Sequence, residues 1–132
     1  VPDLYIAEKL GLSNLEDVFY MKRVRMADRE IIGIEEIYLP ARYCAGLREK
    51  DLAGSLYSIL KNDYGYTIDH IATSIEAVIP DSDDLKLFDA ESSIPLLRVT
   101  GVNITDSNLK LFYEKSLYRS DKYVLNVNIY NK

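Results

Sequence analysis

Apolar and polar residues alternate along much of the chain, a period of two that is typical of β-strands. The pattern begins at 17–26 and resumes at 31–39 after a tight turn at 27–30, which predicts a hairpin. Further strands are predicted at 66–79, 95–105, 109–119 and 122–130. A turn of Asp106, Ser107 and Asn108 joins two of these as another hairpin. The pattern therefore predicts six strands connected largely by hairpins.

Three short helices interrupt these strands. The first follows Pro2 and ends at Gly11, and the second covers 55–60, where the apolar positions have helical spacing. The third begins at Asp81, in a run of acidic residues that favours a helix N-terminus, and ends near Asp89. Strands joined by hairpins, with helices at intervals, indicate an α+β domain around an antiparallel sheet.

Length and composition indicate one ordinary folded domain. The chain has 132 residues, of which 48% are apolar and 28% charged. No apolar run approaches the ~20 residues that a membrane-spanning helix needs, so we expect no membrane partner. Because the chain begins at Val1 without an initiator Met, we expect it to be part of a longer protein.

The charge distribution favours a small anion over a nucleic acid. The net charge of −5 makes the chain a poor candidate for binding a phosphate backbone, which requires many Lys and Arg side chains. Acidic residues gather at 81–91, whereas basic residues gather at 22–29. This uneven field leaves a positive region that suits an anionic small molecule.

Metal and cysteine chemistry are not expected. The sequence contains one cysteine, Cys44, and one histidine, His70, too few for a zinc site built from such ligands. An intrachain disulfide is impossible, which fits a reducing cytoplasm. We expect a small buried side chain at Cys44 and a structural or surface histidine at His70.

Two arginines on the first strand are the first candidates for ligand binding. Arg23 and Arg25 are two residues apart, so both side chains leave the same face. Guanidinium groups bind phosphate or carboxylate with two parallel hydrogen bonds. The alternative is an ion pair with an acid on the partner strand, most simply Glu35. That carboxylate is either paired with the arginines or positioned for sugar hydroxyls.

Other candidates lie on later elements. Phe112, Glu114, Ser116 and Tyr118 share one face of a predicted strand and suit a carbohydrate-like ligand, or else form an exposed polar face. Glu76 is a weaker member of the same class. Two functions of different kinds remain open: a pocket that senses an anionic metabolite, and an enzyme acting on one.

Two details bear on that choice. Ser55 lies in the first turn of a predicted helix, where free N–H groups favour an anion, although such a serine is more often a cap or a surface residue. The carboxylates Glu35 and Glu114 suit glycoside hydrolysis in principle. We rank that reaction low, because acids on separate strands are common in sheets.

The order of short motifs along the chain resembles the UTRA domain, the effector-binding domain of GntR-family transcription regulators of the HutC subfamily. The motifs are Arg23-x-Arg25-x-Ala27-Asp28, Glu35-x-x-Tyr38-Leu39-Pro40, Ser55-Leu56-Tyr57-x-Ile59-Leu60, Tyr64-Gly65-Tyr66-x-Ile68, Pro95-Leu96-Leu97-Arg98-Val99 and Tyr118-Arg119-Ser120-Asp121-Lys122-Tyr123. No single motif is specific, but the series covers nearly the whole chain in order.

The resemblance implies a chorismate lyase-like fold, a six-stranded antiparallel sheet flanked by helices. It implies that residues 1–132 form one effector-binding and dimerisation domain without enzymatic activity or cofactor. A winged helix-turn-helix domain outside this chain would contact DNA. The alternative function for this domain is that of an enzyme with a chorismate lyase-like fold, acting on an anionic substrate. The effector would be a small anion such as a sugar phosphate, and the protein a cytoplasmic homodimer.

The resemblance also assigns roles to individual residues. Arg23, Arg25 and Ser55 would hold the phosphate, and Glu35 and Tyr118 would face the sugar. The full set of predicted effector-binding residues is Arg23, Arg25, Glu35, Ser55, Tyr57, Glu76, Phe112, Glu114 and Tyr118.

The chain departs from the family pattern at two of these positions. Phe112 stands where an acid is usual, with Glu114 displaced by two, and Tyr57 stands where some members have a small hydroxyl residue. These departures argue against carrying over one member's preference for amino sugars.

Overall fold

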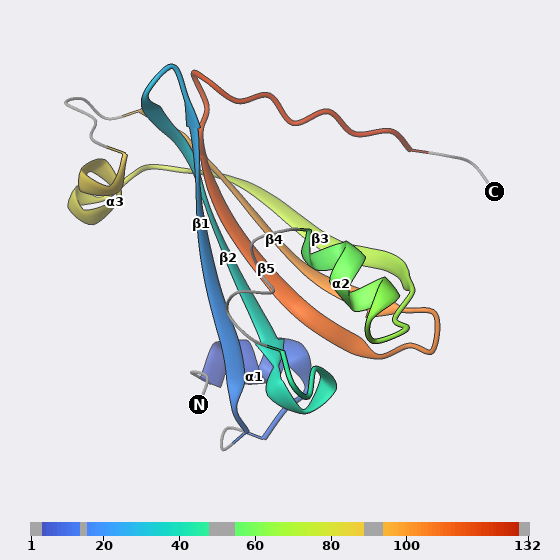
Figure 1. The fold of residues 1–132 in the computed structure, drawn as a ribbon. Helices are drawn as coiled ribbons and strands as arrows, with labels where there is room; N and C mark the ends of the chain where they lie inside the picture. The colour runs from blue at the N-terminus through green and yellow to red at the C-terminus, as the bar shows by residue number, and fades with distance from the viewer. Residues whose placement is uncertain (1–3, 14–15, 48–54, 89–93, 130–132) are drawn as a thin grey trace.

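The central element of the computed structural model, which describes residues 4–13, 16–47, 55–88 and 94–129, is a five-stranded sheet (Figure 1). The strands are β1 (Val18–Ala27), β2 (Glu30–Pro40), β3 (Ile68–Val78), β4 (Leu96–Thr105) and β5 (Lys110–Arg119). Their order is β1-β2-β5-β4-β3, and every neighbouring pair is antiparallel. The predicted α+β class and the antiparallel sheet are confirmed.

The first hairpin forms where the alternating pattern predicts it. Ala27 pairs with Glu30, and the two residues between them, Asp28 and Arg29, have φ values of 50° and 68°. Positive φ at both central residues is the geometry of the type I′ turn, whose twist matches that of two antiparallel strands. The turn therefore sets the register that places β1 beside β2.

The predicted sixth strand at 122–130 is wrong within the part of the chain that the structure describes. After β5 and a turn at 120–122, residues 123–129 leave the sheet as an extended segment without strand pairing (Figure 1). Both edges of β5 are already occupied by β2 and β4, so the chain has no free ladder beside it at this point. The ring of Tyr123 instead stacks on Tyr118, with a centroid separation of 4.0 Å.

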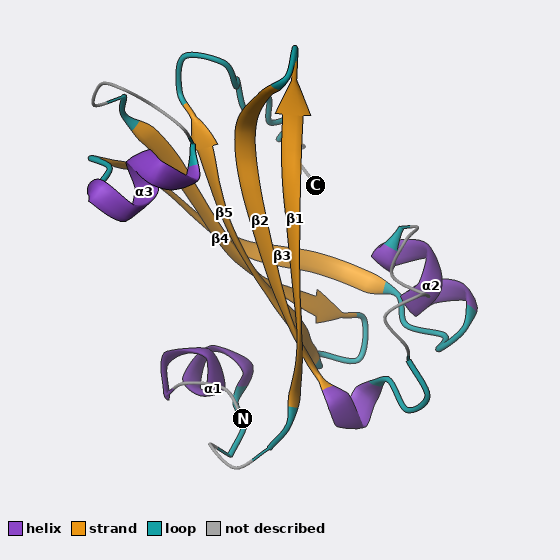
Figure 2. Ribbon diagram, turned by 60° about the vertical axis from the view of Figure 1, so that its left-hand side comes forward, coloured by secondary structure: helices purple, strands orange, loops and turns teal. Residues whose placement is uncertain are grey.

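Three α-helices within these described ranges flank the sheet, α1 (Leu4–Leu10) and α3 (Ser82–Leu87) on one face and α2 (Leu56–Asn62) on the other (Figure 2). A short 3₁₀ helix, η1 (Ala41–Tyr43), follows β2. The helix predicted from Asp81 is confirmed: the Asp81 side chain accepts from the Asp84 N–H at 2.9 Å, and the Asp84 side chain accepts from the Asp81 N–H at 3.1 Å. This reciprocal capping satisfies N–H groups that otherwise have no partner at a helix start.

The core is divided between the two faces of the sheet. Under α2, the buried Leu56 and Leu60 pack with Phe112 of β5, and on the other face α1 packs around Tyr113. Phe112 and Tyr113, which are consecutive in β5, thus point into different clusters, as the strand period requires. We call the two sides the α2 face and the α1/α3 face. No helix within the described residues has the length and apolar character needed to cross a membrane.

Candidate functional site

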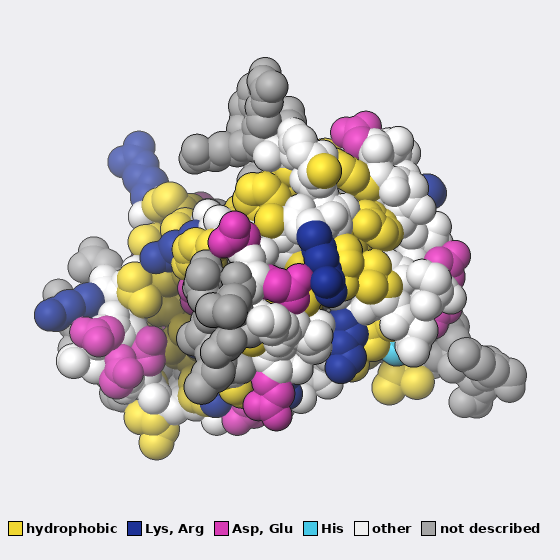
Figure 3. Space-filling view, turned by 90° about the horizontal axis from the view of Figure 1, so that it is seen from below, with side chains coloured by type: hydrophobic (Ala, Val, Ile, Leu, Met, Phe, Trp, Pro, Cys, Tyr) yellow, Lys and Arg dark blue, Asp and Glu magenta, His cyan; other side chains and the backbone are white. Residues whose placement is uncertain are grey.

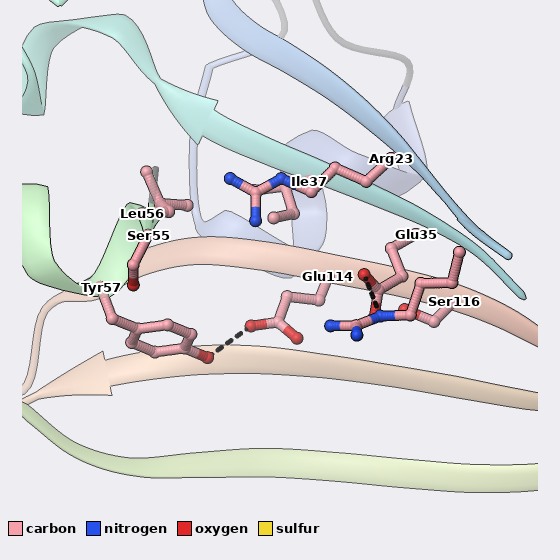
Figure 4. A pocket seen from close by; sticks show the side chains of 9 residues that line it. Arg23, Glu35, Ile37, Ser55, Leu56, Tyr57, Glu114 and Ser116 are labelled. Carbon is pink, nitrogen blue, oxygen red and sulfur yellow. Dashed lines mark hydrogen bonds and ion pairs between the residues drawn. The ribbon is translucent and has the colours of Figure 1, made fainter. Parts of the chain in front are cut away.

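A cavity of about 440 Å³ opens on the α2 face, where β1, β2 and β5 meet the start of α2 (Figure 4). Most of the residues that the sequence predicts as effector-binding line it. These are Arg23, Arg25, Glu35, Ser55, Tyr57 and Glu114. They come from the β1–β2 hairpin, the start of α2 and β5, so the fold brings together three parts of the chain that are distant in sequence.

Arg23 and Arg25 reach the cavity from alternate positions of β1, opposite Glu35 and Gly33 of β2. The Nε of Arg25 donates to Glu35 Oε1 at 3.0 Å, and this hydrogen bond and the carboxylate charge raise the pKa of the guanidinium. Yet the Arg25 side chain remains 61% exposed. The two interpretations of this arginine therefore both hold: it is paired with Glu35, and it lines a solvent-reachable cavity.

Glu35 is held from two sides. Its Oε1 accepts from Arg25, and its Oε2 accepts from the hydroxyl of Tyr118 at 2.6 Å. Burial, together with the bond to Glu35, raises the pKa of Tyr118, so the phenol keeps its proton and remains a donor. The close approach of Tyr118 to β2 depends on Gly33, because a Cβ there would lie 2.5 Å from Tyr118 Cδ1.

A second polar cluster, which joins α2 to the sheet, includes one residue that the sequence analysis missed. The hydroxyl of Tyr57 donates to Glu114 Oε1 at 2.7 Å (Figure 4). The same hydroxyl lies 3.0 Å from Asn103 Oδ1, and Asn103 Nδ2 donates to the same Glu114 oxygen at 2.8 Å. Asn103 is fully buried. Its signal in the sequence was a polar residue between Val102 and Ile104 in a predicted strand, a position where an unpaired side chain is costly.

Burial also determines the state of Tyr57. Loss of water contact, followed by the charge of Glu114, raises the pKa of its hydroxyl. The group is therefore a donor at neutral pH. Its ring packs edge-on against Phe112 at a centroid distance of 5.6 Å, so Tyr57 forms both polar and apolar contacts across the interface between α2 and β5.

Three predicted residues do not line the cavity: Tyr118, which contacts it only through Glu35, and Glu76 and Phe112. Glu76 lies on the α1/α3 face, where it pairs with Arg98 at 3.2 Å, because residues 75 and 77 are the ones that point to the α2 face. Phe112 is completely buried beneath Tyr57. Ser55 does line the cavity, and its hydroxyl caps α2 through a long 3.4 Å contact with the Ser58 N–H.

The chemistry of the cavity is that of a binding site. Arg23 and Arg25 supply positive charge and hydrogen-bond donors, whereas Glu35 and Glu114 supply acceptors. Among the described residues, no group of three or more His, Cys, Asp or Glu is placed to hold a metal ion. Basic and acidic side chains are mixed across the face seen in Figure 3, without the continuous basic patch that nucleic acid requires.

Comparison with known proteins identifies relatives over nearly the full chain. A family model described as "UTRA domain" matches residues 2–124. The chain is 30% identical over 120 residues to the HTH-type transcriptional regulator GgaR of Escherichia coli (strain K12), covering 90% of this chain and 47% of the relative. It is 28% identical to the HTH-type transcriptional repressor PhnF of Mycolicibacterium smegmatis, covering 91% of this chain and 49% of the relative. The chain therefore spans about half the length of these curated relatives.

Solved structures show the same fold. A GntR-family transcriptional regulator from Enterococcus faecalis V583 aligns with a TM-score of 0.90 at 23% identity, covering 97% of this chain and 92% of that one. The effector domain of PhnF from Mycobacterium smegmatis aligns with a TM-score of 0.85 at 26% identity, covering 98% and 80%. These relatives are named as transcription regulators, in agreement with the expectation of a regulatory rather than an enzymatic role.

Proposed function

Because the chain belongs to the UTRA domain family, we propose that it is the effector-binding domain of a GntR-family transcription regulator of the HutC type. A small anionic metabolite, most simply a sugar phosphate, occupies the cavity beside Arg23 and Arg25. A separate winged helix-turn-helix domain contacts DNA, and the regulator works as a cytoplasmic homodimer. Residues 1–132 supply the binding and dimerisation functions.

The observation that carries this proposal is the pair of arginines lining one cavity from alternate positions of β1. The volume of about 440 Å³ lies within the range of small-molecule sites. Guanidinium groups match phosphate oxygens, and the carboxylates of Glu35 and Glu114 match the hydroxyl groups of a sugar. With seven residues, α2 is short, so the argument rests on the arginines and not on a helix dipole.

The contacts around Arg25 support a route from the ligand to the rest of the chain. An anion on Arg25 competes with Glu35 for the guanidinium. Glu35 is bonded to Tyr118, whose ring stacks on Tyr123 in the segment after β5. Ligand binding therefore favours one arrangement of this segment over another. Such a population shift requires that the ligand bind the two arrangements with different affinities.

The test begins with a thermal-shift screen of sugar phosphates, each compared with its unphosphorylated sugar. A ligand at a hundred times its dissociation constant adds about 2.7 kcal/mol of stability, which gives a clear shift. The compound with the largest shift is then titrated calorimetrically into the wild type, Arg25→Ala and Arg23→Ala. We expect each variant to bind about tenfold more weakly or worse, because a charge-assisted hydrogen bond contributes ~1.5–3 kcal/mol.

Lys22→Ala is the matched control. Lys22 lies on the same strand with the same charge, but it is opposite Glu36 on the α1/α3 face. We expect Lys22→Ala to bind the compound found in the screen with the same affinity as the wild type. The proposal is refuted if Arg25→Ala binds as tightly as the wild type, or if Lys22→Ala weakens binding equally.

A further inference from the structure

We propose that a second anion-binding site lies on the α1/α3 face of the sheet, opposite the cavity assigned to the effector. A cavity of about 300 Å³ opens on this face, lined by residues of α1, β3, β4 and β5. The ligand that fits it is a small oxyanion, whose carboxylate or phosphate group is held between Arg98 and Lys115. The lining residues are Tyr5, Glu76, Arg98, Thr100, Tyr113 and Lys115.

The two cavities are separate because consecutive residues of β5 point to opposite faces of the sheet. Glu114 and Ser116 line the cavity on the α2 face, whereas Tyr113 and Lys115 line the one on the α1/α3 face. Among the described residues, none lines both cavities. An anion in one cavity therefore leaves the other open, and the two sites are tested independently.

The second cavity holds more positive charge than its one carboxylate compensates. Thr100 of β4 pairs with Lys115 of β5, and Arg98 is two residues before Thr100, so the two cations are diagonal neighbours with long side chains. Arg98 Nη2 donates to Glu76 Oε2 at 3.2 Å, but a guanidinium has five N–H donors and this side chain is 37% exposed. One positive charge is left over for a ligand.

The acid that faces Lys115 in the sheet is already engaged elsewhere. Glu36 of β2 pairs with Lys115, but its Oε2 accepts from the Tyr20 hydroxyl at 2.6 Å and lies 3.4 Å from the Tyr38 hydroxyl. Within the part of the chain that the structure describes, Lys115 forms no ion pair. Because neighbouring cations repel each other, an anion between Lys115 and Arg98 is stabilised by both.

A buried hydroxyl supplies a further donor. Tyr113 is 1% exposed, and its hydroxyl donates to the Tyr5 hydroxyl at 3.5 Å, longer than the usual distance of about 2.5–3.0 Å. Burial, followed by the bond to Tyr5, raises the pKa of Tyr113, so the phenol keeps its proton at neutral pH. The Tyr5 ring also packs edge-on against Tyr113. A ligand oxygen that accepts from Tyr113 therefore connects α1 to the sheet.

The test follows the backbone amides of the 132-residue chain by NMR during titration with inorganic phosphate and, separately, with malonate, in a chloride buffer. Phosphate and malonate distinguish the two groups that fit the site. Amides of α1 and of residues 98–100 report the second cavity, because these segments do not line the first. Amides of β1 and α2 report the first cavity. We expect at least one anion to shift the α1 and 98–100 amides.

Lys115→Ala should weaken this binding about tenfold or more, and Tyr113→Phe about threefold or more. Lys110→Ala is the matched control, since Lys110 is on the same strand with the same charge but lies ~17 Å along it from Lys115 and does not line this cavity. We expect Lys110→Ala to change the affinity less than about threefold. Thermal unfolding of each variant checks that the fold is retained.

Arg25→Ala separates the two sites. It should weaken the shifts of the β1 and α2 amides and leave the α1 and 98–100 amides responding as in the wild type. The inference is overturned if neither anion at about 10 mM shifts the α1 and 98–100 amides, if folded Lys115→Ala and Tyr113→Phe bind as tightly as the wild type, or if Lys110→Ala weakens binding as much as Lys115→Ala. Shifts confined to β1 and α2 refute the second site and leave the proposed effector cavity standing.

Discussion

Replacing Tyr118 with Phe removes one hydroxyl beside the cavity and keeps the aromatic ring. In the wild type this hydroxyl donates to Glu35 Oε2 at 2.6 Å, and the ring stacks on Tyr123 with an interplanar angle of 7°. Phe retains the stack and the apolar surface that β5 buries. The substitution therefore isolates the hydrogen bond to Glu35.

The size of the effect follows from the surroundings of the carboxylate. A hydrogen bond to a charged group contributes ~1.5–3 kcal/mol. The side chain of Glu35 is 19% exposed and keeps its bond to Arg25, so water replaces part of the lost interaction. We expect the free energy of unfolding to fall by about 1–2 kcal/mol, which lowers the Tm of a domain of this size by about 3–8 °C.

The assay is urea denaturation followed by far-UV circular dichroism, with an unchanged slope as the check that the unfolded state is the same. Tyr113→Phe is the matched control, since Tyr113 is also buried on β5 but donates to the neutral Tyr5 hydroxyl at 3.5 Å. We expect the free energy of unfolding of Tyr113→Phe to fall by less than about 0.5 kcal/mol.

A double-mutant cycle tests whether Glu35 is the hydrogen-bond partner of the Tyr118 hydroxyl. Glu35→Ala combined with Tyr118→Phe should cost less than the sum of the two single changes, because both remove the same hydrogen bond. If Tyr118→Phe is as stable as the wild type, or no less stable than Tyr113→Phe, the reasoning about this hydrogen bond is wrong.

Two other substitution and titration experiments test the packing. Gly33→Ala should lower the unfolding free energy by about 1–3 kcal/mol, because its Cβ would lie 2.5 Å from Cδ1 and 2.8 Å from Cε1 of the buried Tyr118 ring. Gly101→Ala should cost less, because its Cβ would lie 2.9 Å from Cγ2 of the half-exposed Ile71 and 3.3 Å from Thr73 Oγ1; equal losses in urea denaturation would contradict this. Burial raises the pKa of the Cys44 thiol to about 11, so its reaction with a disulfide reagent at pH 8 should be far slower in the folded chain than in urea. Because the unfolded thiol ionises first, stability should decline as pH rises from about 9 towards 11; a flat profile in the wild type, or the same decline in Cys44→Ala, would refute this assignment.

Much of the fold was predictable because its signals are local. The alternation in β1 and β2 places Arg23, Arg25 and Glu35 on one face without reference to any other part of the chain. The acidic run at Asp81 marks the start of α3 through contacts between residues three apart. Ser55 is likewise the N-cap of α2.

The missed features depend on which strands are neighbours and in what register. Alternation says that Glu76 and Glu114 each share a face with their own strand neighbours, but only the pairing of β3, β4 and β5 shows that the two carboxylates lie on opposite faces. The same pairing places Asn103 beneath Tyr57 of α2. These relations connect residues far apart in the chain, and no local pattern encodes them.

The segment after β5 shows the difference between what the sequence determines and what the tertiary structure decides. From the sequence alone, residues 122–130 have the alternation of a strand, because that pattern is a property of the side chains in order. Whether a strand forms depends on a neighbouring backbone with free N–H and C=O groups, which tertiary structure decides. Here β2 and β4 already occupy both edges of β5, and the described residues of this segment pair with neither outer strand of the sheet, β1 or β3, so they remain extended and unpaired.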